Sequence, residues 1–425
     1  MSTTGQSSST RHGVSAQNYV RAEPTWPAAV IAGGWRTGML GMRSLIRRGV
    51  PTCCIDTNPR YPAFKSAYGS AFRCPNPDTD PVGWVAFMIE TASRMGGQPV
   101  LIASADQFVS AIAEHEARLA PYYLLSPGVA VQGLLATKQT QYRLAFEHGM
   151  PMPRTQCVST AEEVTAFAED AVFPCLVKPL HFREWQGFAD GHPLYYQKIA
   201  IAKTPSALME SWCLAASINP NVILQEIIQG SDVNKRVYVS CYDRAGRRIA
   251  NAMFRELRCD PVGFGPATVS EPVVDPEADR MCDTFLRSLA YSGVCEIELK
   301  RDDRDGQVKL IEANPRLTGG GDAAPYAGVD VCWLHYLDMI GKEVAPVTPN
   351  GKDFRHIVLR SDVGAIIGYR RAGLLSWYDV VRSFRPPLAF FDLDRDDWRY
   401  SLETFYIMVR STIGLLLRSL LRDER

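Results

Sequence analysis

The sequence has no excess of charge of either sign, since Lys and Arg total 46 among its 425 residues and Asp and Glu also total 46. A chain without a basic field is not expected to hold a nucleic-acid backbone, so nucleic acid is not an expected partner. The 11 cysteines include the adjacent pair Cys53 and Cys54 but no C-x-x-C spacing. This odd number and spacing indicate reduced thiols in a cytosol, and neither a disulfide framework nor a zinc site.

The sequence also lacks the signatures of several enzyme classes. Its seven histidines form no H-x-x-x-H pair, and it contains neither a G-x-S-x-G turn nor a Walker A loop. These absences argue against a zinc hydrolase, a nucleophile-elbow hydrolase and a P-loop nucleotidase. Cys157, Cys175, Cys241 and Cys295 lie in apolar, strand-like segments, where we interpret them as small core residues and not as catalytic thiols.

No continuous hydrophobic run matches a secretory signal or a membrane-spanning helix. Residues 1–27 are rich in Ser and Thr and predict a disordered tail. The apolar segment 405–421 is interrupted by Arg410 and Arg418 and is too polar to span a bilayer. We interpret it as an amphipathic helix packed on the body, and a membrane-surface helix is the less favoured alternative. The expected location is the cytoplasm.

The chain is long and apolar enough, with 46% hydrophobic residues, to form two or three packed domains. Strand-like runs at 28–32, 51–56 and 99–104 alternate with helical segments, which predicts a parallel, doubly wound α/β sheet. The turn at 33–41 reads GGxxxGxxG and departs from the dinucleotide-binding G-x-G-x-x-G pattern. NAD binding is therefore a minor alternative, and a small-molecule site at this turn remains open.

A second unit begins near Lys138, where the sequence predicts a helix over 139–148. Strand-like segments follow at 173–179, which contains Lys178, and at 221–228 and 236–241. Their spacing predicts an α+β region with antiparallel strands.

The stretch 293–321 reads GVCEIELKRDDRDGQVKLIEANPRLTGGG and predicts a β-hairpin that turns at Asp305-Gly306. Folding this hairpin brings Glu298 near Glu312, with Asn314 on the same returning strand. Two carboxylates and an amide oxygen are hard ligands of the kind that Mg²⁺ prefers. The alternative is an exposed hairpin with solvated charges, which does not explain an acid at the end of an apolar strand followed by Asn-Pro-Arg.

Taken in order, these motifs resemble the ATP-grasp superfamily, whose fold pairs a preliminary α/β domain with two α+β subdomains that clasp ATP between them. The resemblance covers roughly residues 28–325, and the ordered set is more specific than any one motif. The matching positions are Lys138 and Lys178 for the nucleotide-binding lysines, Glu226 (carbonyl) and Ile228 (amide) for the adenine-binding hinge, Glu298, Glu312 and Asn314 for the metal ligands, and Arg316 for the N-P-R arginine.

Within the superfamily, the chain is most similar to the D-aspartate ligase and carboxylate–amine ligase group, through GSDVN at 230–234 and RELR at 255–258. The segment 180–195 departs from the glycine- or serine-rich loop that covers phosphate in relatives, so we assign it no role. The resemblance implies an α/β N-terminal domain at 28–134, a first ATP-grasp subdomain at 135–230, a second with the metal site at 231–345, and a C-terminal helical extension at 346–425 that ends in an amphipathic helix.

The function implied is an ADP-producing ligase that joins a small-molecule carboxylate to an amine through an acyl-phosphate, using ATP and one or two Mg²⁺ ions, with Mn²⁺ as an alternative ion. Lys138 and Lys178 would neutralise phosphate charge. Asp232, which follows the hinge, is the candidate for the ribose hydroxyls. Arg316 would orient the carboxylate or the phosphoryl group, and a structural salt bridge is its alternative role.

Three further positions are weaker candidates. Arg255 and Arg258 would bind phosphate or the second substrate, although exposed strand charges explain them almost as well. Gly320 would let the backbone approach an anion closely, and a flexible turn is the alternative interpretation.

Two other functions remain open. A phosphotransferase of the same fold would stop at a phosphorylated product, and a nucleotide-sensing module would have lost catalysis. Neither the two substrates nor the oligomeric state follows from the sequence, and a homodimer is one open arrangement.

Overall fold

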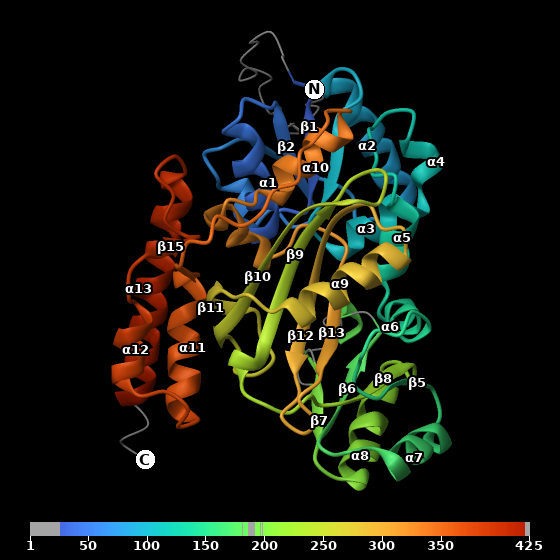
Figure 1. Cartoon of the computed structure of the whole chain (residues 1–425), viewed down its shortest axis with the longest axis vertical. Helices are drawn as coiled ribbons and strands as arrows, with labels where there is room; N and C mark the ends of the chain where they lie inside the picture. The colour runs from blue at the N-terminus through green and yellow to red at the C-terminus, as the bar shows by residue number, and fades with distance from the viewer. Residues whose placement is uncertain (1–25, 181, 186–191, 196, 198, 421–425) are drawn as a thin grey trace, which may run out of the picture.

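The computed structural model describes residues 26–180, 182–185, 192–195, 197 and 199–420, so the tail predicted at 1–27 lies almost wholly outside the described residues. Figure 1 shows an N-terminal unit at one end of the long axis, a small sheet at the other end, and a larger sheet between them. A group of C-terminal helices lies along one side.

The N-terminal unit contains a parallel sheet in the order β3-β2-β1-β4. Its central strand is buried on both faces, since Ile31 packs in the core that contains Met39 and Val30 packs in the core that contains Trp84. The predicted parallel α/β sheet is confirmed. Its elements are β1 (Ala29–Ala32), α1 (Arg36–Ile46), β2 (Thr52–Asp56), η1 (Pro62–Phe64), β3 (Ser70–Arg73), α2 (Pro81–Met95), β4 (Val100–Ala103), α3 (Asp106–Glu114), α4 (Glu116–Leu119) and α5 (Val129–Ala136).

The small sheet is antiparallel and has the order β5-β8-β6-β7. Helices α7 and α8 cover one face, with Phe167 of α7 and Leu208 of α8 in the same core as Val177. The elements are α6 (Lys138–Glu147), β5 (Thr155–Val158), α7 (Ala161–Asp170), β6 (Cys175–Pro179), η2 (Phe182–Trp185), β7 (Ala200–Ala202), α8 (Pro205–Ala216) and β8 (Val222–Glu226).

The large sheet has seven strands in the order β13-β12-β9-β10-β11-β14-β15. Successive residues of β9 point to opposite faces of the sheet. Tyr238 packs with Phe285 of α9 on one face, while Val239 packs on the other face in the core shared with the N-terminal unit. The elements are η3 (Asp232–Asn234), β9 (Lys235–Tyr242), β10 (Arg248–Cys259), β11 (Ala267–Pro272), α9 (Pro276–Ser288), β12 (Gly293–Arg301), β13 (Val308–Asn314), η4 (Gly320–Asp322), η5 (Ala324–Ala327), α10 (Val331–Met339), β14 (Arg355–Ile357) and β15 (Leu388–Phe390).

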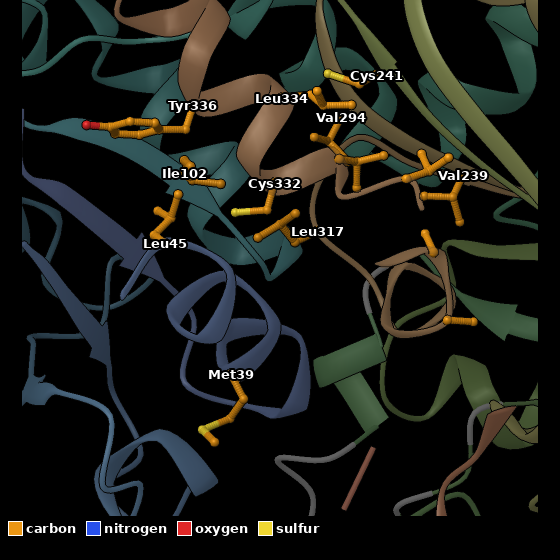
Figure 2. Packing of buried hydrophobic residues seen from close by; sticks show 14 of the residues in the cluster. Met39, Leu45, Ile102, Val239, Cys241, Val294, Leu317, Cys332, Leu334 and Tyr336 are labelled. Atoms are coloured by element: carbon orange, nitrogen blue, oxygen red, sulfur yellow. The ribbon is translucent and has the colours of Figure 1, made fainter. Parts of the chain in front are cut away.

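The N-terminal unit and the large sheet share one hydrophobic core. Figure 2 shows Met39 of α1 and Ile102 of β4 in the same cluster as Val239, Val294 and Leu317. Burial of apolar side chains from both parts holds the segment after β13 against the N-terminal unit. This packing places the open end of the β12–β13 hairpin, where β12 begins and β13 ends, beside the carboxyl ends of the parallel strands.

The C-terminal extension is built into the large sheet. Its strands β14 and β15 continue the sheet beyond β11. Helices α11 (Leu359–Arg371) and α12 (Trp377–Ser383) lie between these two strands in the chain, and α13 (Trp398–Leu420) follows β15. Among the described residues, no helix is both long enough and apolar enough to cross a membrane.

Candidate active site

The β12–β13 hairpin places two acidic residues directly opposite each other. Glu298 pairs with Glu312, and Glu296 pairs with Asn314, in an antiparallel register. Directly paired residues project on the same face of a sheet, with Cβ atoms about 5 Å apart. The predicted hairpin is confirmed, and it brings Glu298, Glu312 and Asn314 to one place.

This face of the hairpin concentrates negative charge. Burial raises the pKa of Glu298, and the carboxylates of Glu296, Glu312 and Glu256 raise it further. Carboxylates held together in this way are stabilised by a cation, and two carboxylates with an amide oxygen fit Mg²⁺. In the described part of the chain, no group of three or more Asp, Glu, His or Cys side chains is arranged to hold a metal ion. The candidate set accordingly relies on two carboxylates and an amide.

Two lysines face this acidic hairpin. Lys138, the first residue of α6, has its Nζ 3.7 Å from Glu312 Oε1. Lys178 on β6 is buried and donates to Tyr142 Oη at 2.5 Å and to Gln225 Oε1 at 3.0 Å. Burial lowers the pKa of Lys178 to about 7, and the positive charge of Lys138 adds to this effect. An anionic ligand beside Lys178 would therefore favour the charged form of its amine and raise its pKa.

The predicted adenine-binding segment follows β8. The Glu226 backbone N–H donates to Arg154 O at 3.0 Å, and its side-chain Oε1 accepts from Val172 N at 2.8 Å. Ile228 is buried, and Gly230 adopts a φ of 118°, which a residue with a Cβ rarely adopts. The hinge segment is therefore held by one backbone and one side-chain hydrogen bond of Glu226, with a glycine at the bend.

Asp232 lies just beyond the hinge and is engaged within the fold. Its carboxylate accepts hydrogen bonds from Tyr369 Oη and from Gly263 N, the latter at 3.2 Å, and it lies 3.1 Å from Lys235 Nζ. Lys235 also pairs with Glu256 at 3.0 Å. No motif in the sequence marked Tyr369 or Lys235, and Glu256 lies within the RELR stretch at 255–258, of which only the arginines were candidates.

Arg316 is fixed by a residue from the N-terminal unit. Its Nε and Nη2 bind the two carboxylate oxygens of Asp106 at 2.5 and 3.0 Å, and Nη2 also donates to Asn314 Oδ1 at 3.0 Å. Burial raises the pKa of Asp106, but Arg316 and Lys138 outweigh burial and lower it. Asp106 is the first residue of α3, and no motif in the sequence marked it.

The glycine turn after Arg316 packs tightly against the hairpin. A Cβ on Gly320 would lie 2.1 Å from Glu296 Oε2 and 2.4 Å from Val237 Cγ1. Thr318 Oγ1 donates to the same Glu296 oxygen at 2.5 Å. The backbone at Gly320 approaches a carboxylate of the fold itself, and only glycine fits there.

The remaining two predicted arginines have partners within the fold. Arg255 Nε donates to Glu271 Oε1 at 2.6 Å on the sheet surface. Arg258 is 1% exposed, binds both oxygens of Asp362 at 2.9 and 2.7 Å, and donates to Ser383 Oγ at 2.7 Å. Arg258 therefore ties β10 to the C-terminal helices.

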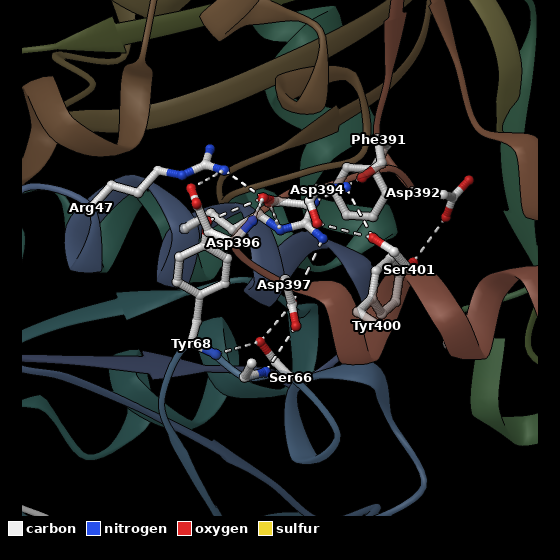
Figure 3. Close-up of polar contacts among 12 residues, drawn as sticks. Arg47, Ser66, Tyr68, Phe391, Asp392, Asp394, Asp396, Asp397, Tyr400 and Ser401 are labelled. Carbon is white, nitrogen blue, oxygen red and sulfur yellow. Dashed lines mark hydrogen bonds and ion pairs between the residues drawn. The ribbon is translucent and has the colours of Figure 1, made fainter.

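A cavity of about 990 Å³ opens between α1, the η4–α10 segment and the loop after β15. Arg43 of α1 and the two arginines that follow the helix line it, opposite several aspartates. Figure 3 shows Arg47 facing Asp394 and Asp396, to which Arg47 Nη2 donates at 2.6 and 3.3 Å. Asp322 lines the same cavity and lies 2.8 Å from Arg36 Nε. The cavity therefore reaches the end of the glycine turn, because Asp322 is the last residue of η4.

The segment 180–195 falls partly outside the described residues, and within the described part Trp185 is buried in the core of the small sheet. Asp56, which ends β2, accepts from Gly34 N at 2.6 Å and from Asn58 N at 2.9 Å. The first hydrogen bond fixes the glycine turn from the end of the neighbouring strand, and the second is local to the segment after β2.

No protein-family model matches the chain. The D-aspartate ligase of Enterococcus faecium (strain Aus0004) is 26% identical over 260 residues, which are 57% of this chain and 59% of that protein. The match therefore spans less than two thirds of the length of that relative.

Two solved structures show the same fold at low identity. N5-carboxyaminoimidazole synthetase from Staphylococcus aureus, complexed with ADP, has a TM-score of 0.60 at 14% identity, covering 82% of this chain and 87% of that one. The biotin carboxylase domain of the Hydrogenobacter thermophilus 2-oxoglutarate carboxylase, with MgADP, ADP and bicarbonate, has a TM-score of 0.57 at 14% identity, covering 76% and 71%. At these identities the likeness concerns the fold alone.

Proposed function

We propose that the chain is an ATP-grasp ligase, which joins a carboxylate to an amine at the expense of ATP. In the first step, a carboxylate oxygen of the substrate attacks the γ-phosphorus of ATP, and the bond to the β-phosphate oxygen breaks to release ADP. In the second step, the amine nitrogen attacks the acyl carbon of the acyl-phosphate. Inorganic phosphate leaves, the nitrogen loses a proton, and an amide remains.

The observation that carries this proposal is the convergence of lysines and carboxylates from different elements. Lys138 of α6 lies 3.7 Å from Glu312 of β13, and Glu312 is directly opposite Glu298 of β12. Phosphoryl transfer requires positioning and charge neutralisation more than a protein nucleophile, and these groups supply both. The two fold relatives were solved as complexes with ADP and with MgADP, which supports a nucleotide as a ligand of this chain.

We propose that Glu298, Glu312 and Asn314 hold Mg²⁺. The bound ion would neutralise charge on the β- and γ-phosphate oxygens. Lys138 and Lys178 would bind the phosphates from the opposite side, with Lys178 recovering its full charge next to the phosphate anion. The Glu226 carbonyl and the Ile228 amide would bind adenine.

Arg316 is proposed to orient the reacting carboxylate or phosphoryl group. Its Nε and Nη2 are bound by Asp106 and Asn314, and Nη1 also donates to Leu317 O at 3.3 Å. An anion would therefore bind the aligned guanidinium through the remaining Nη1 hydrogen. Asp106 is then a positioning residue, contributed by the N-terminal unit. For the ribose role, Asp232 would have to exchange its hydrogen bond from Tyr369 for one from a ribose hydroxyl.

A second substrate has a candidate place in the cavity beside α1. The cavity adjoins the glycine turn through Asp322 and Arg36, and its charged lining contains both signs. Such a lining favours a ligand that carries a carboxylate and an ammonium group, as an amino acid does. The match to D-aspartate ligase supports this class of substrate.

The test is ADP release from the purified full chain with Mg-ATP, screened against amino acids and other carboxylates with and without amines. The expected result is ADP formation that needs both a carboxylate and an amine, with a product whose mass equals the sum of the two less one water. A phosphorylated product formed without an amine would replace the ligase with a phosphotransferase. Nucleotide binding without turnover in every well would favour the sensing module.

A further inference from the structure

The outward face of α12 and the turn before it is apolar. Leu374, Trp377, Tyr378 and Val381 are 63%, 64%, 72% and 74% exposed, at helical spacing, while Val380 is buried. In a helix that lies on the surface of a globular protein, the polar residues normally face solvent and the apolar ones face the core. This helix therefore presents a second apolar face that the described chain does not cover.

Helix α13 repeats the pattern. Trp398, Leu402, Phe405, Tyr406 and Val409 are 57%, 58%, 64%, 64% and 42% exposed and follow one stripe of the helix. The opposite side packs on the protein, where Tyr400 and Thr404 are buried and Tyr400 stacks edge-on against Phe391. Patches of large exposed apolar side chains mark sites of contact with a protein or a membrane.

Positive charge surrounds the α12 patch. Arg370, Arg371, Arg382 and Arg385 are all exposed in the segment 370–385, and its one acidic residue is Asp379. The Asp379 carboxylate is used in the capping box with Ser376 at the start of α12. The segment is thus locally basic in a chain whose formal net charge is zero.

We propose that α12, α13 and the segment that joins α11 to α12 form a surface that binds anionic lipid bilayers. Exposed Trp and Tyr rings prefer the headgroup region of a bilayer, and nearby arginines bind anionic headgroups. A second copy of the chain is the competing occupant. A two-fold interface would bring the same four arginines face to face, and like charges disfavour that contact.

The location of this surface fits membrane attachment of the whole molecule. The three C-terminal helices lie together along one side of the molecule in Figure 1, away from the small sheet. Arg258, Asp362 and Ser383 anchor α11 and α12 to β10 through buried hydrogen bonds. A membrane contact made by these helices would therefore hold the catalytic sheet at the bilayer surface.

The test is co-sedimentation of the full chain with vesicles of phosphatidylcholine alone and of phosphatidylcholine mixed with phosphatidylglycerol. The full chain is expected to sediment with the mixed vesicles and to be released by salt. The double variant Trp377→Ser/Tyr378→Ser and the double variant Arg370→Gln/Arg371→Gln should each weaken binding about tenfold or more. All four side chains are exposed. Arg370 also donates to Leu375 O at 2.6 Å, a single exposed hydrogen bond whose loss should leave the chain folded.

Phe146→Ser provides the matched control, because Phe146 on α6 is 80% exposed and lies outside this surface. The control should bind mixed vesicles as the unmodified chain does. Absence of binding to mixed vesicles would overturn the proposal, and so would equal losses in the control and the double variants. A dimer that Trp377→Ser/Tyr378→Ser converts to monomers, without any vesicle binding, would assign the surface to a second copy instead.

Discussion

Glu298 and Glu312 are direct neighbours across two adjacent strands, and this contact between like charges is the central feature of the candidate site. Burial and the surrounding carboxylates raise the pKa of Glu298, so the folded chain holds a group whose ionised form is disfavoured until a cation arrives. A stable fold does not need this arrangement. A site for a divalent cation explains it.

Replacing Glu312 with Gln is expected to lower turnover about a hundredfold or more, because the substitution removes one charged ligand and leaves the strand pairing unchanged. The measurement is ADP release as a function of Mg²⁺ concentration. Glu169→Gln, an exposed position on α7, serves as the matched control and should retain full activity. Undiminished turnover in Glu312→Gln would remove this residue from the metal site.

Lys178 is expected to take up protons when nucleotide binds. Burial and Lys138 hold its pKa at about 7 in the free protein, so the amine is partly neutral between about pH 7 and 8. A phosphate group beside it favours the charged form and raises the pKa, so binding draws protons from solution. Calorimetric titrations with ADP in buffers of different ionisation enthalpy measure this uptake.

Lys178→Arg is the control for proton uptake, because a guanidinium stays charged at every pH of the experiment. The variant should bind ADP with less proton uptake than the unmodified chain at the same pH. Equal uptake in both proteins would mean that another group titrates on binding.

Gly320→Ala is expected to cost about 1–3 kcal/mol of stability and to impair turnover, because its Cβ would overlap Glu296 and Val237. The adjacent Gly319→Ala is the matched control. Its Cβ would meet only the tip of the Arg36 side chain, which can move aside. Urea unfolding and ADP release measure both effects. Equal behaviour of the two variants would contradict the claim that tight packing at Gly320 shapes the site.

The hairpin that carries the candidate metal ligands could be predicted from sequence because its determinants are local. Alternation of side chains and the Asp305-Gly306 turn are enough to set the pairing of Glu298 with Glu312. The parallel N-terminal sheet was predictable for a similar reason, since its strands are short apolar runs separated by helical segments. The edge strand Ser70–Arg73 was missed because two of its four residues are exposed and its sequence has no apolar run.

Contacts between distant segments could not be predicted. Arg316 and Asp106 are 210 residues apart, and the positions of both depend on how the N-terminal unit packs against the large sheet. Arg258 was predicted as a candidate for phosphate or substrate, whereas its guanidinium is buried against Asp362. A single sequence shows that an arginine is present, but its partner is chosen by tertiary packing.

Breaking the Arg258–Asp362 pair should be strongly destabilising. Both side chains are 2% exposed, so Arg258→Met leaves a buried carboxylate without its main partner, at a cost of about 3–5 kcal/mol. The double variant Arg258→Met/Asp362→Leu should recover much of this loss, because neither charge remains buried. Urea unfolding measures all three proteins.

Arg255→Met on the same strand is the control for this cycle. Arg255 pairs with Glu271 near the surface, where an ion pair contributes about 1 kcal/mol or less. A loss in Arg258→Met no larger than in Arg255→Met would show that the pair does not anchor the C-terminal helices.

Burial of His335 on α10 should make the free energy of unfolding depend on pH. His335 is 5% exposed, its Nδ1 has no hydrogen-bond partner among the described residues, and burial lowers its pKa to about 4. The imidazole of His335 binds its proton near pH 6.5 in the unfolded chain, but only near pH 4 in the folded chain. The stabilising contribution of the neutral imidazole is therefore fully present above pH 6.5 and decreases as the pH falls towards 4. At pH 5 the loss relative to pH 7 is about 2 kcal/mol.

Urea unfolding at pH 7 and pH 5 tests this dependence through the difference between variants, because carboxylates elsewhere in the chain also titrate. In His335→Gln, the decrease in unfolding free energy between the two pH values should be smaller by about 2 kcal/mol than in the unmodified chain. His148→Gln, at an exposed position after α6, should keep the full decrease. If His335→Gln also keeps it, protonation of the buried imidazole is not what weakens the fold in mild acid.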